Sequence, residues 1–318
     1  MSTNGRRPSR YVSMPNTPVD RDMAREPVTT EPAGRAGRYA GLFAYARTAA
    51  ERIAASPHRP VTGRAVRLRA AALALLDAPH RTPPDHEVPR TAAYDALDVL
   101  VEEWPSLAVG RLDGADVMRS RPGLWGRLMT EWPMMEYADA LVAALPRLYT
   151  GTESVLEIGS GVGNATARLA PLYRERLVWT DRELSLVRHS RWPGTGRVFD
   201  FDLEPPDDLG RFDAIVGINA LHCAADIART LGRLRRLLLP GGILLLAEGN
   251  SPTRSDGTPW ALDLLFNAFD GWWDRGGFRT RSEWREALSS QGYTDIRTSA
   301  MTAGSDDLGG LIWAYRPE

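Results

Sequence analysis

Hydrophobic positions give the chain two different patterns, one on each side of residue 153. Between residues 37 and about 148, apolar residues recur at the three- and four-residue spacing of amphipathic helices. This spacing is clearest over residues 42–53, 66–75, 94–101 and 134–148. From Glu153 onward, short apolar runs alternate with helical patterns. The chain is therefore expected to place a helical N-terminal or lid region, residues 37–150, before an α/β core, residues 151–318.

The short apolar runs after residue 153 are typical of strands, and helical patterns lie between them. The expected strands are Val155–Ile158, Leu177–Thr180, Arg197–Phe199, Ala214–Ile218, Ile243–Ala247, Asp295–Thr298 and Leu311–Tyr315, and the expected helices are Gly163–Tyr173, Arg182–His189, Ala225–Leu239 and Arg281–Gln291. Such alternation predicts a doubly wound, mostly parallel Rossmann-like sheet with helices on both faces. In this fold, ligands bind at the carboxyl ends of the strands.

Composition narrows the class of protein. Residues 1–36 contain five prolines among small polar residues and arginine, a composition that predicts a disordered arm. The 39 basic and 40 acidic residues nearly cancel, so charge favours neither nucleic acid nor an anionic membrane as partner. No apolar run reaches the roughly 18 residues of a membrane span. We expect a soluble, cytoplasmic protein.

Residue usage also excludes several chemistries. All 39 basic residues are arginine, which excludes a lysine Schiff base and a P-loop lysine. Cys223 is the single cysteine, so the chain has no intrachain disulfide. The five histidines are scattered without the spacing of metal ligands, and we expect no metal site.

The sharpest local motif follows the first expected strand and reads VLEIGSGVGNAT from Val155 to Thr166. Glycines allow positive φ angles and a close approach of the backbone to a ligand. The Gly-x-Gly-x-Gly spacing differs from the Gly-x-Gly-x-x-Gly of dinucleotide sites. Asp181 ends the second strand, where its carboxylate could accept hydrogen bonds from ribose hydroxyls, although this acid alone would also suit NAD. The third strand is followed by Asp200-Phe201-Asp202, which suits an adenine amine and ring.

These residues resemble the first motifs of class I S-adenosylmethionine-dependent methyltransferases. The resemblance implies S-adenosylmethionine as cofactor, and it assigns a set of cofactor-binding residues. These are Glu157, the glycines Gly159, Gly161 and Gly163 at the methionine part, Asp181 at the ribose, Asp200 with Phe201 at the adenine, and Asn219. Asp202 is an alternative to Asp200. In the opposing interpretation, Glu157 and Asp181 are merely solvated acids at strand ends.

A histidine and a glutamate follow the next two strands. His222 comes after the fourth strand and Glu248 after the fifth. Neighbouring strands lie about 4.8 Å apart, so both side chains should emerge at one edge of the sheet. A carboxylate there would fix the imidazole tautomer while the ring accepts a proton. The alternative is that His222 caps the helix beginning near Ala224 and that Glu248 is a loop acid.

The stretch NALHCAADIARTLGRLRRLLLPGGILLLAEGN and the sequence after it resemble the C-methyltransferase domains of polyketide synthases, from about Trp125 to Glu318. The shared features are the Asn219–His222 turn, the strand ending in Glu248, Gly271-Trp272-Trp273 and Trp284. The resemblance implies that His222 is the catalytic base and Glu248 its orienting partner. Cys223 stands where the family often has alanine, which we interpret as a packing variant.

An aromatic helical insertion is expected at about residues 256–278. Its aromatic residues suit either packing of a lid or contact with the substrate. Tyr137, Trp272 and Trp273 are the expected substrate-binding residues.

The combined prediction is an enzyme of natural-product biosynthesis. It would methylate the α-carbon of a β-ketoacyl group, either free or bound to an acyl carrier protein. An O- or N-methyltransferase of a small natural-product scaffold is the alternative activity, although the Asn/Asp-Pro-Pro-Tyr/Phe turn of base-methylating enzymes is absent. A non-catalytic interaction protein with the same fold is the alternative of another class. Residues 37–120 could serve a homodimer or a lid.

Overall fold

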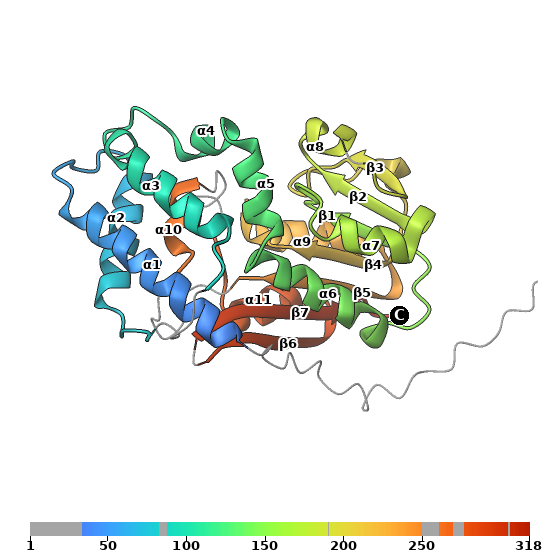
Figure 1. The fold of residues 1–318 in the computed structure, drawn as a ribbon. Coiled ribbons are helices and arrows are strands. Elements are labelled where there is room, and N and C mark those ends of the chain that lie inside the picture. The colour runs from blue at the N-terminus through green and yellow to red at the C-terminus, as the bar shows by residue number, and fades with distance from the viewer. Residues whose placement is uncertain (1–33, 83–87, 190, 250–260, 270–276, 305) are drawn as a thin grey trace, which may run out of the picture.

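The computed structural model describes residues 34–318, except 83–87, 190, 250–260, 270–276 and 305. A helical region lies beside a seven-stranded sheet (Figure 1). The first six helices are α1 (Arg35–Ala55), α2 (Gly63–Asp77), α3 (Ala92–Ala108), α4 (Gly114–Arg119), α5 (Pro122–Thr130) and α6 (Met134–Leu148). The predicted arm over residues 1–36 falls almost wholly outside the described residues.

The sheet has the strand order β3-β2-β1-β4-β5-β7-β6. Its strands are β1 (Val155–Ile158), β2 (Leu177–Asp181), β3 (Thr195–Val198), β4 (Phe212–Ile218), β5 (Leu238–Glu248), β6 (Thr294–Ala303) and β7 (Asp306–Tyr315). The first five strands pair in parallel, and β7 runs antiparallel between β5 and β6. This arrangement confirms the predicted doubly wound, mostly parallel sheet.

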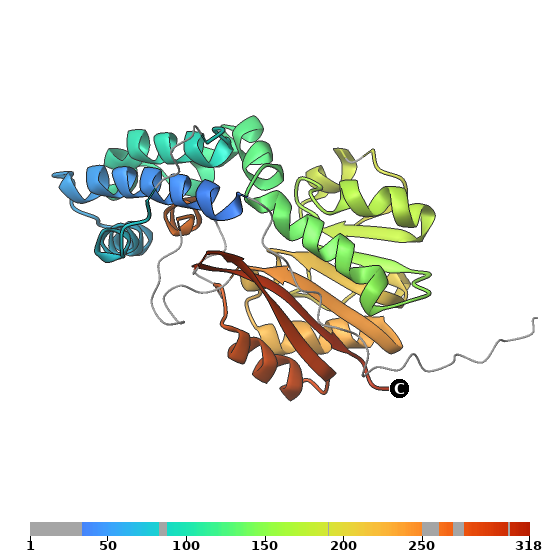
Figure 2. The ribbon, with the colours of Figure 1, turned by 60° about the horizontal axis from the view of Figure 1, so that its bottom comes forward.

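Helices cover both faces of the sheet (Figure 2). The core helices are α7 (Thr166–Tyr173), α8 (Leu184–His189), α9 (Ile227–Leu237) and α11 (Arg281–Ser290). Apolar residues of α6 and α7 pack in one core cluster, and those of α9 and α11 pack in another. Alternate residues of β1 divide between these clusters, as the two-residue period of a strand requires. Val155 joins the first cluster, and Leu156 the second.

Several element ends differ from the prediction for local reasons. Helix α7 begins at Thr166 rather than Gly163 because Gly159, Gly161 and Gly163 all adopt positive φ angles, which interrupt a right-handed helix. Helix α9 begins at Ile227 because the Asp226 side chain caps it by accepting a hydrogen bond from the Arg229 backbone at 3.0 Å. Strands β6 and β7 extend beyond the predicted ranges.

Helix α10 (Asp263–Phe269) follows the sheet in sequence but packs among helices of the N-terminal region (Figure 1). All of its residues are buried. The Ala261 backbone donates to the Tyr39 hydroxyl at 3.0 Å, and Arg64 donates to the Ala268 carbonyl at 3.1 Å. A Cβ atom at Gly114 would lie 1.6 Å from that same carbonyl oxygen, so only glycine fits there. The helical region is therefore built from two distant parts of the chain.

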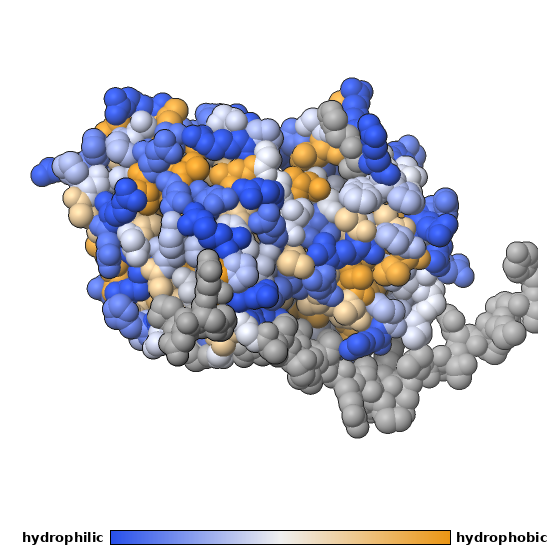
Figure 3. Space-filling view, in the orientation of Figure 1, coloured by the Kyte–Doolittle hydropathy of each residue, from blue (hydrophilic) through white to orange (hydrophobic). Residues whose placement is uncertain are grey.

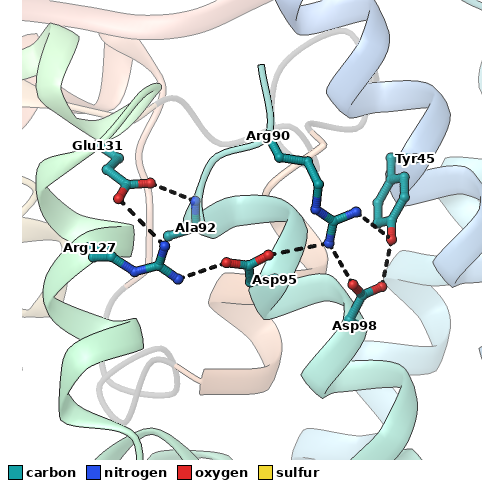
Figure 4. Close-up of polar contacts among 7 residues, drawn as sticks. All are labelled: Tyr45, Arg90, Ala92, Asp95, Asp98, Arg127 and Glu131. Atoms are coloured by element: carbon teal, nitrogen blue, oxygen red, sulfur yellow. Dashed lines mark hydrogen bonds and ion pairs between the residues drawn. The ribbon is translucent and has the colours of Figure 1, made fainter. Parts of the chain in front are cut away.

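A polar network joins α1, α3 and α5 on the surface of the helical region (Figure 4). Asp98 accepts hydrogen bonds from Tyr45 and Arg90, both at 2.6 Å. Arg127 of α5 pairs with Asp95 of α3 at 2.7 Å. These side chains are partly exposed, and exposed ion pairs each contribute little stability. The network fixes the relative positions of the helices more than it stabilises them.

Buried polar contacts attach the helical region to the β6–β7 end of the sheet. Arg35 of α1 pairs with Glu136 of α6 at 2.6 Å and donates to the Thr302 carbonyl at 3.1 Å. Arg81 forms a two-pronged ion pair with Asp306 at the start of β7. The α1 helix is therefore anchored to the sheet by charged contacts as well as by apolar packing.

The face seen in Figure 3 is mostly hydrophilic, with small scattered groups of hydrophobic side chains. No helix within the described ranges is both long enough and apolar enough to cross a membrane.

Candidate active site

A cleft of about 250 Å³ opens at the carboxyl ends of the first strands. Most of the predicted cofactor and catalytic residues line it, namely Glu157, Gly159, Gly161, Asp181, Asp200, Phe201, Asn219 and His222. Side chains from α5, α6 and α10 also line it, including Trp125, Met134 and Phe266. The cleft thus lies between the sheet and the helical region.

The glycine loop lies close to the backbone around it. Gly159 has a φ of 62°, and a Cβ atom there would lie 2.8 Å from the Ala220 Cβ. The Gly161 N–H donates to Asp181 Oδ2 at 2.9 Å, and the other oxygen of Asp181 accepts from the Glu183 N–H at 2.9 Å. Asp181 therefore braces the loop from the end of β2. Gly163 is not among the residues lining the cleft; a Cβ atom there would lie 3.0 Å from the Trp192 side chain.

Glu157 is a buried acid at the end of β1. Its side chain is 2% exposed and accepts a hydrogen bond from Thr166 Oγ1 at 2.7 Å. Burial raises the pKa of Glu157 to about 7. Glu157 therefore fixes the first turn of α7 below the cleft, and it is not the solvated strand-end acid of the opposing interpretation.

The two acids after β3 have different surroundings. Asp202 accepts hydrogen bonds from the Ala225 backbone at 3.1 Å and from Thr230 Oγ1 at 3.2 Å, so it fixes the segment leading into α9. Asp200 accepts from the Asp202 N–H at 2.9 Å, and both acids line the cleft. Of the two, Asp200 has fewer ties to a neighbouring helix, which favours it over Asp202 for a bound ligand.

His222 and Glu248 form a buried pair at the edge of the cleft. His222 Nδ1 lies 3.0 Å from Glu248 Oε2. Glu248 Oε1 accepts two further hydrogen bonds, from the backbone N–H groups of Ala220 at 3.0 Å and Leu221 at 2.8 Å. Because a carboxylate can only accept, the shared proton belongs to Nδ1, and Nε2 is the nitrogen that carries the lone pair of the ring. The Phe278 ring packs 4.4 Å from the imidazole, centroid to centroid.

Asn219 holds the ends of β4 and β5 together. It has a φ of 44°, a conformation that asparagine tolerates better than most residues. Its N–H donates to the Ala247 carbonyl at 2.8 Å, and its side-chain oxygen accepts from the Gly249 N–H at 2.9 Å. The chain then enters a short 3₁₀ turn that carries His222. Asn219 thus fixes the spacing between the histidine and the glutamate.

Cys223 was interpreted as a packing variant, but it contacts the ring of His222. Its Sγ lies 3.3 Å from His222 Nε2, and it lines the cleft. A neutral thiol is a weak donor, and Nε2 is the acceptor in the tautomer set by Glu248.

The predicted substrate-binding residues are placed differently. Tyr137 is buried outside the cleft, and its hydroxyl donates to the Leu308 carbonyl, so it joins α6 to β7 instead of facing a ligand. Burial raises the pKa of the Tyr137 hydroxyl well above its ordinary value, which keeps it a neutral donor. Trp272 and Trp273 lie outside the described residues.

Asn164 was missed by the sequence interpretation, and Phe266 was expected only as one of the aromatic residues of the insertion. Asn164 follows the glycine loop, and its amide donates to the carbonyls of Met129 at 2.8 Å and Met134 at 3.3 Å. It therefore ties the loop to the α5–α6 segment. Phe266 of α10 packs edge-on to the His222 ring at 6.4 Å. No periodicity indicated either contact, because each joins segments far apart in the sequence. Within the described residues, no cluster of His, Cys, Asp and Glu could hold a metal ion.

Comparison with known proteins finds a domain family and several relatives. Residues 156–244 match a family model described as a methyltransferase domain. The polyketide methyltransferase ustM of Ustilaginoidea virens is 30% identical over 229 residues, which make up 63% of this chain and 51% of that protein. The 3-methylorcinaldehyde synthase of Sarocladium schorii is 31% identical over 236 residues, which make up 62% of this chain and 8% of the synthase. The chain thus spans about half of the first relative and a small part of the second.

Solved structures agree in fold. The C-methyltransferase domain of the citrinin polyketide synthase superposes with a TM-score of 0.68 at 19% identity, covering 91% of each chain. The trans-methyltransferase CalH, solved with S-adenosylhomocysteine, has a TM-score of 0.68 at 16% identity, covering 91% of this chain and 93% of CalH. The chain therefore contains a methyltransferase domain over residues 156–244, and its fold is that of the neighbours just described. Its relatives include a polyketide methyltransferase and a 3-methylorcinaldehyde synthase, and it shares its fold with the C-methyltransferase domain of the citrinin polyketide synthase.

Proposed function

We propose that this methyltransferase transfers a methyl group from S-adenosylmethionine to the α-carbon of a β-ketoacyl group, with His222 as the base. The observation that carries this proposal is the His222–Glu248 pair, in which Glu248 is held by two backbone donors and His222 lines the cleft. Glu248 thus fixes the orientation and the tautomer of a ring that reaches the cleft, which is the arrangement that a general base needs.

The residues of the cleft fit the cofactor. At Gly161 a Cβ atom would meet only the Gly159 carbonyl oxygen, at 3.9 Å, so the loop leaves open space there. Asp181 presents a carboxylate at the end of β2. Asp200 and Phe201 would meet the adenine, and Asp181 the ribose. When bound, S-adenosylmethionine supplies an electrophilic methyl group. Its positive charge suits a cleft whose carboxylates include Asp181 and Asp200.

The chemistry assigned to the protein is proton removal. A carbon between a ketone and a thioester or acid is acidic enough for a neutral imidazole to deprotonate. Nε2 of His222 would take that proton, leaving an enolate, and Glu248 would stabilise the imidazolium through the Nδ1–H bond. A positioned base contributes about 10²–10⁴-fold in rate. Phe266 and Phe278 pack against the ring and limit the access of water to it.

The relatives support a polyketide-like acceptor, because ustM is named a polyketide methyltransferase. Whether this acceptor arrives on an acyl carrier protein or as a free acid is decided by offering both forms. Binding of an acyl carrier protein and formation of a homodimer stay predictions.

The test is a mass-spectrometric assay with S-adenosylmethionine and β-ketoacyl pantetheine thioesters, alongside the matching free acids. Wild-type protein should add a single methyl group at the α-carbon. The His222→Ala variant should lose transfer while still binding S-adenosylhomocysteine in calorimetry. His80→Ala, which alters an exposed histidine, is the matched control and should be fully active. Methylation at oxygen or nitrogen, or unchanged turnover in His222→Ala, would contradict the proposal.

A further inference from the structure

A small second cavity, of about 10 Å³, adjoins the cleft between α5, α6 and α10. We call it the end pocket, and its lining residues are Trp125, Leu128, Met129, Met134, Leu262, Leu265 and Phe266. Trp125, Met129, Met134 and Phe266 line the main cleft as well. The end pocket is therefore the apolar continuation of the cleft toward the helical region, and every side chain lining it is apolar.

The end pocket begins beside the reacting centre. Phe266, which lines both cavities, packs against the His222 ring. Met134, which also lines both, has its sulfur 3.7 Å from the Asn219 amide at the end of β4. An acceptor whose α-carbon meets His222 Nε2 therefore has this apolar space within reach of its alkyl end.

The wall formed by Leu262 and by Leu265 of α10 is buried and packed against the helical region. Leu262 and Leu265 belong to a buried segment, 1% and 3% exposed, respectively. Its C-terminal end is fixed where Gly114 packs against the Ala268 carbonyl and where Arg64 donates to that carbonyl. The opposite wall is softer, because Met129 and Met134 have flexible side chains that fill irregular space. The size of the pocket is therefore set mainly by the leucines.

We propose that the end pocket receives the alkyl end of the acceptor and restricts the enzyme to short β-ketoacyl groups. A cavity of about 10 Å³ holds roughly one water molecule, which is close to the size of a methyl group. Longer chains would force the buried leucines and the fixed helix to move, which a packed interior resists. This inference rests on the proposed function, and it names the substrate class within it.

The experiment compares kcat/KM for 3-oxoacyl pantetheine thioesters of four, six and eight carbons. Wild type should prefer four carbons to eight by about tenfold or more, a selectivity that overpacking can supply. Leu265→Ala opens the pocket and should shift the eight-to-four ratio toward the longer chain by about tenfold. Leu231→Ala is the matched control, because it removes an equally buried leucine from α9, outside the end pocket. It should leave the ratio unchanged.

A second variant keeps the test decisive if Leu265→Ala does not fold. Leu128→Ala opens the pocket from α5 and should shift the ratio in the same direction. Equal use of all three chain lengths by wild type, or an unchanged ratio in both folded variants, overturns the end-pocket proposal. Failure of wild type to methylate any chain length overturns the proposed function instead, so the two failures are distinguishable.

Discussion

The Glu248→Gln variant tests whether Glu248 determines which nitrogen of the His222 ring carries the proton. Glutamine keeps the shape of the side chain, and its oxygen can still accept from the N–H groups of Ala220 and Leu221. Its amide nitrogen then faces His222 Nδ1, where it can only donate. The imidazole must therefore place its proton on Nε2, which removes the lone pair that the proposed mechanism uses.

The expected magnitude follows from this change of tautomer. Where a histidine base is held in the wrong tautomer by such a replacement, kcat falls by about 10⁴-fold. We expect a loss of about 10³–10⁴-fold here. Alanine would be a poorer test, because it would leave two buried N–H groups without an acceptor, at about 1–3 kcal/mol each.

The assay is single-turnover methyl transfer followed by mass spectrometry, with calorimetry of S-adenosylhomocysteine as the binding control. Binding should change by less than about threefold, because Glu248 does not line the main cleft. Urea denaturation checks that the variant is folded. Turnover within about threefold of wild type would refute the assignment of the tautomer and, with it, the role of Glu248.

Three further predictions concern the loop, a buried acid and the thiol. Gly159→Ala places a Cβ atom 2.8 Å from the Ala220 side chain at a φ of 62°, so S-adenosylhomocysteine should bind at least about tenfold more weakly in calorimetry; unchanged affinity would contradict the close packing of the loop. Burial raises the pKa of Glu157 from 4.5 to about 7, so in the cofactor-free protein the ionised form destabilises the fold as pH rises through that range. By linkage, the wild-type free energy of unfolding should fall by about 3 kcal/mol relative to Glu157→Gln between pH 4.5 and 7.5 in urea titrations, and parallel pH profiles would refute this. Iodoacetamide should inactivate wild type by filling the space beside His222 Nε2, whereas Cys223→Ala should stay active and resistant; equal sensitivity of the two proteins would place the reactive group elsewhere.

The sheet was predictable because each of its strands is marked by a pattern of residues that are close together in the sequence. Each strand is a short apolar run, and residues such as Asp181 and Glu248 come at its end, so a parallel fold brings them to one edge without further assumptions. The glycine motif likewise predicts its own turn. The same reasoning placed His222 beside Glu248, and in the structure His222 Nδ1 lies 3.0 Å from Glu248 Oε2.

Contacts that depend on where a helix packs could not be predicted from the sequence. Tyr137 has the helical spacing of a core residue, yet its place at β7 rather than at the cleft depends on how α6 crosses the sheet. Nothing in the pattern of α10 shows that it packs against α2 and α4. The end pocket and the contact of Phe266 with His222 follow from that packing, and so they needed the structure.

The burial of α10 among the N-terminal helices has a consequence for synthesis on the ribosome. The Tyr39 hydroxyl of α1 accepts a hydrogen bond from the Ala261 backbone, which is synthesised 222 residues later. Helix α10 follows the fifth strand, so the N-terminal helices lack this buried partner until most of the chain has been made. The packing of the helical region is therefore completed late in translation.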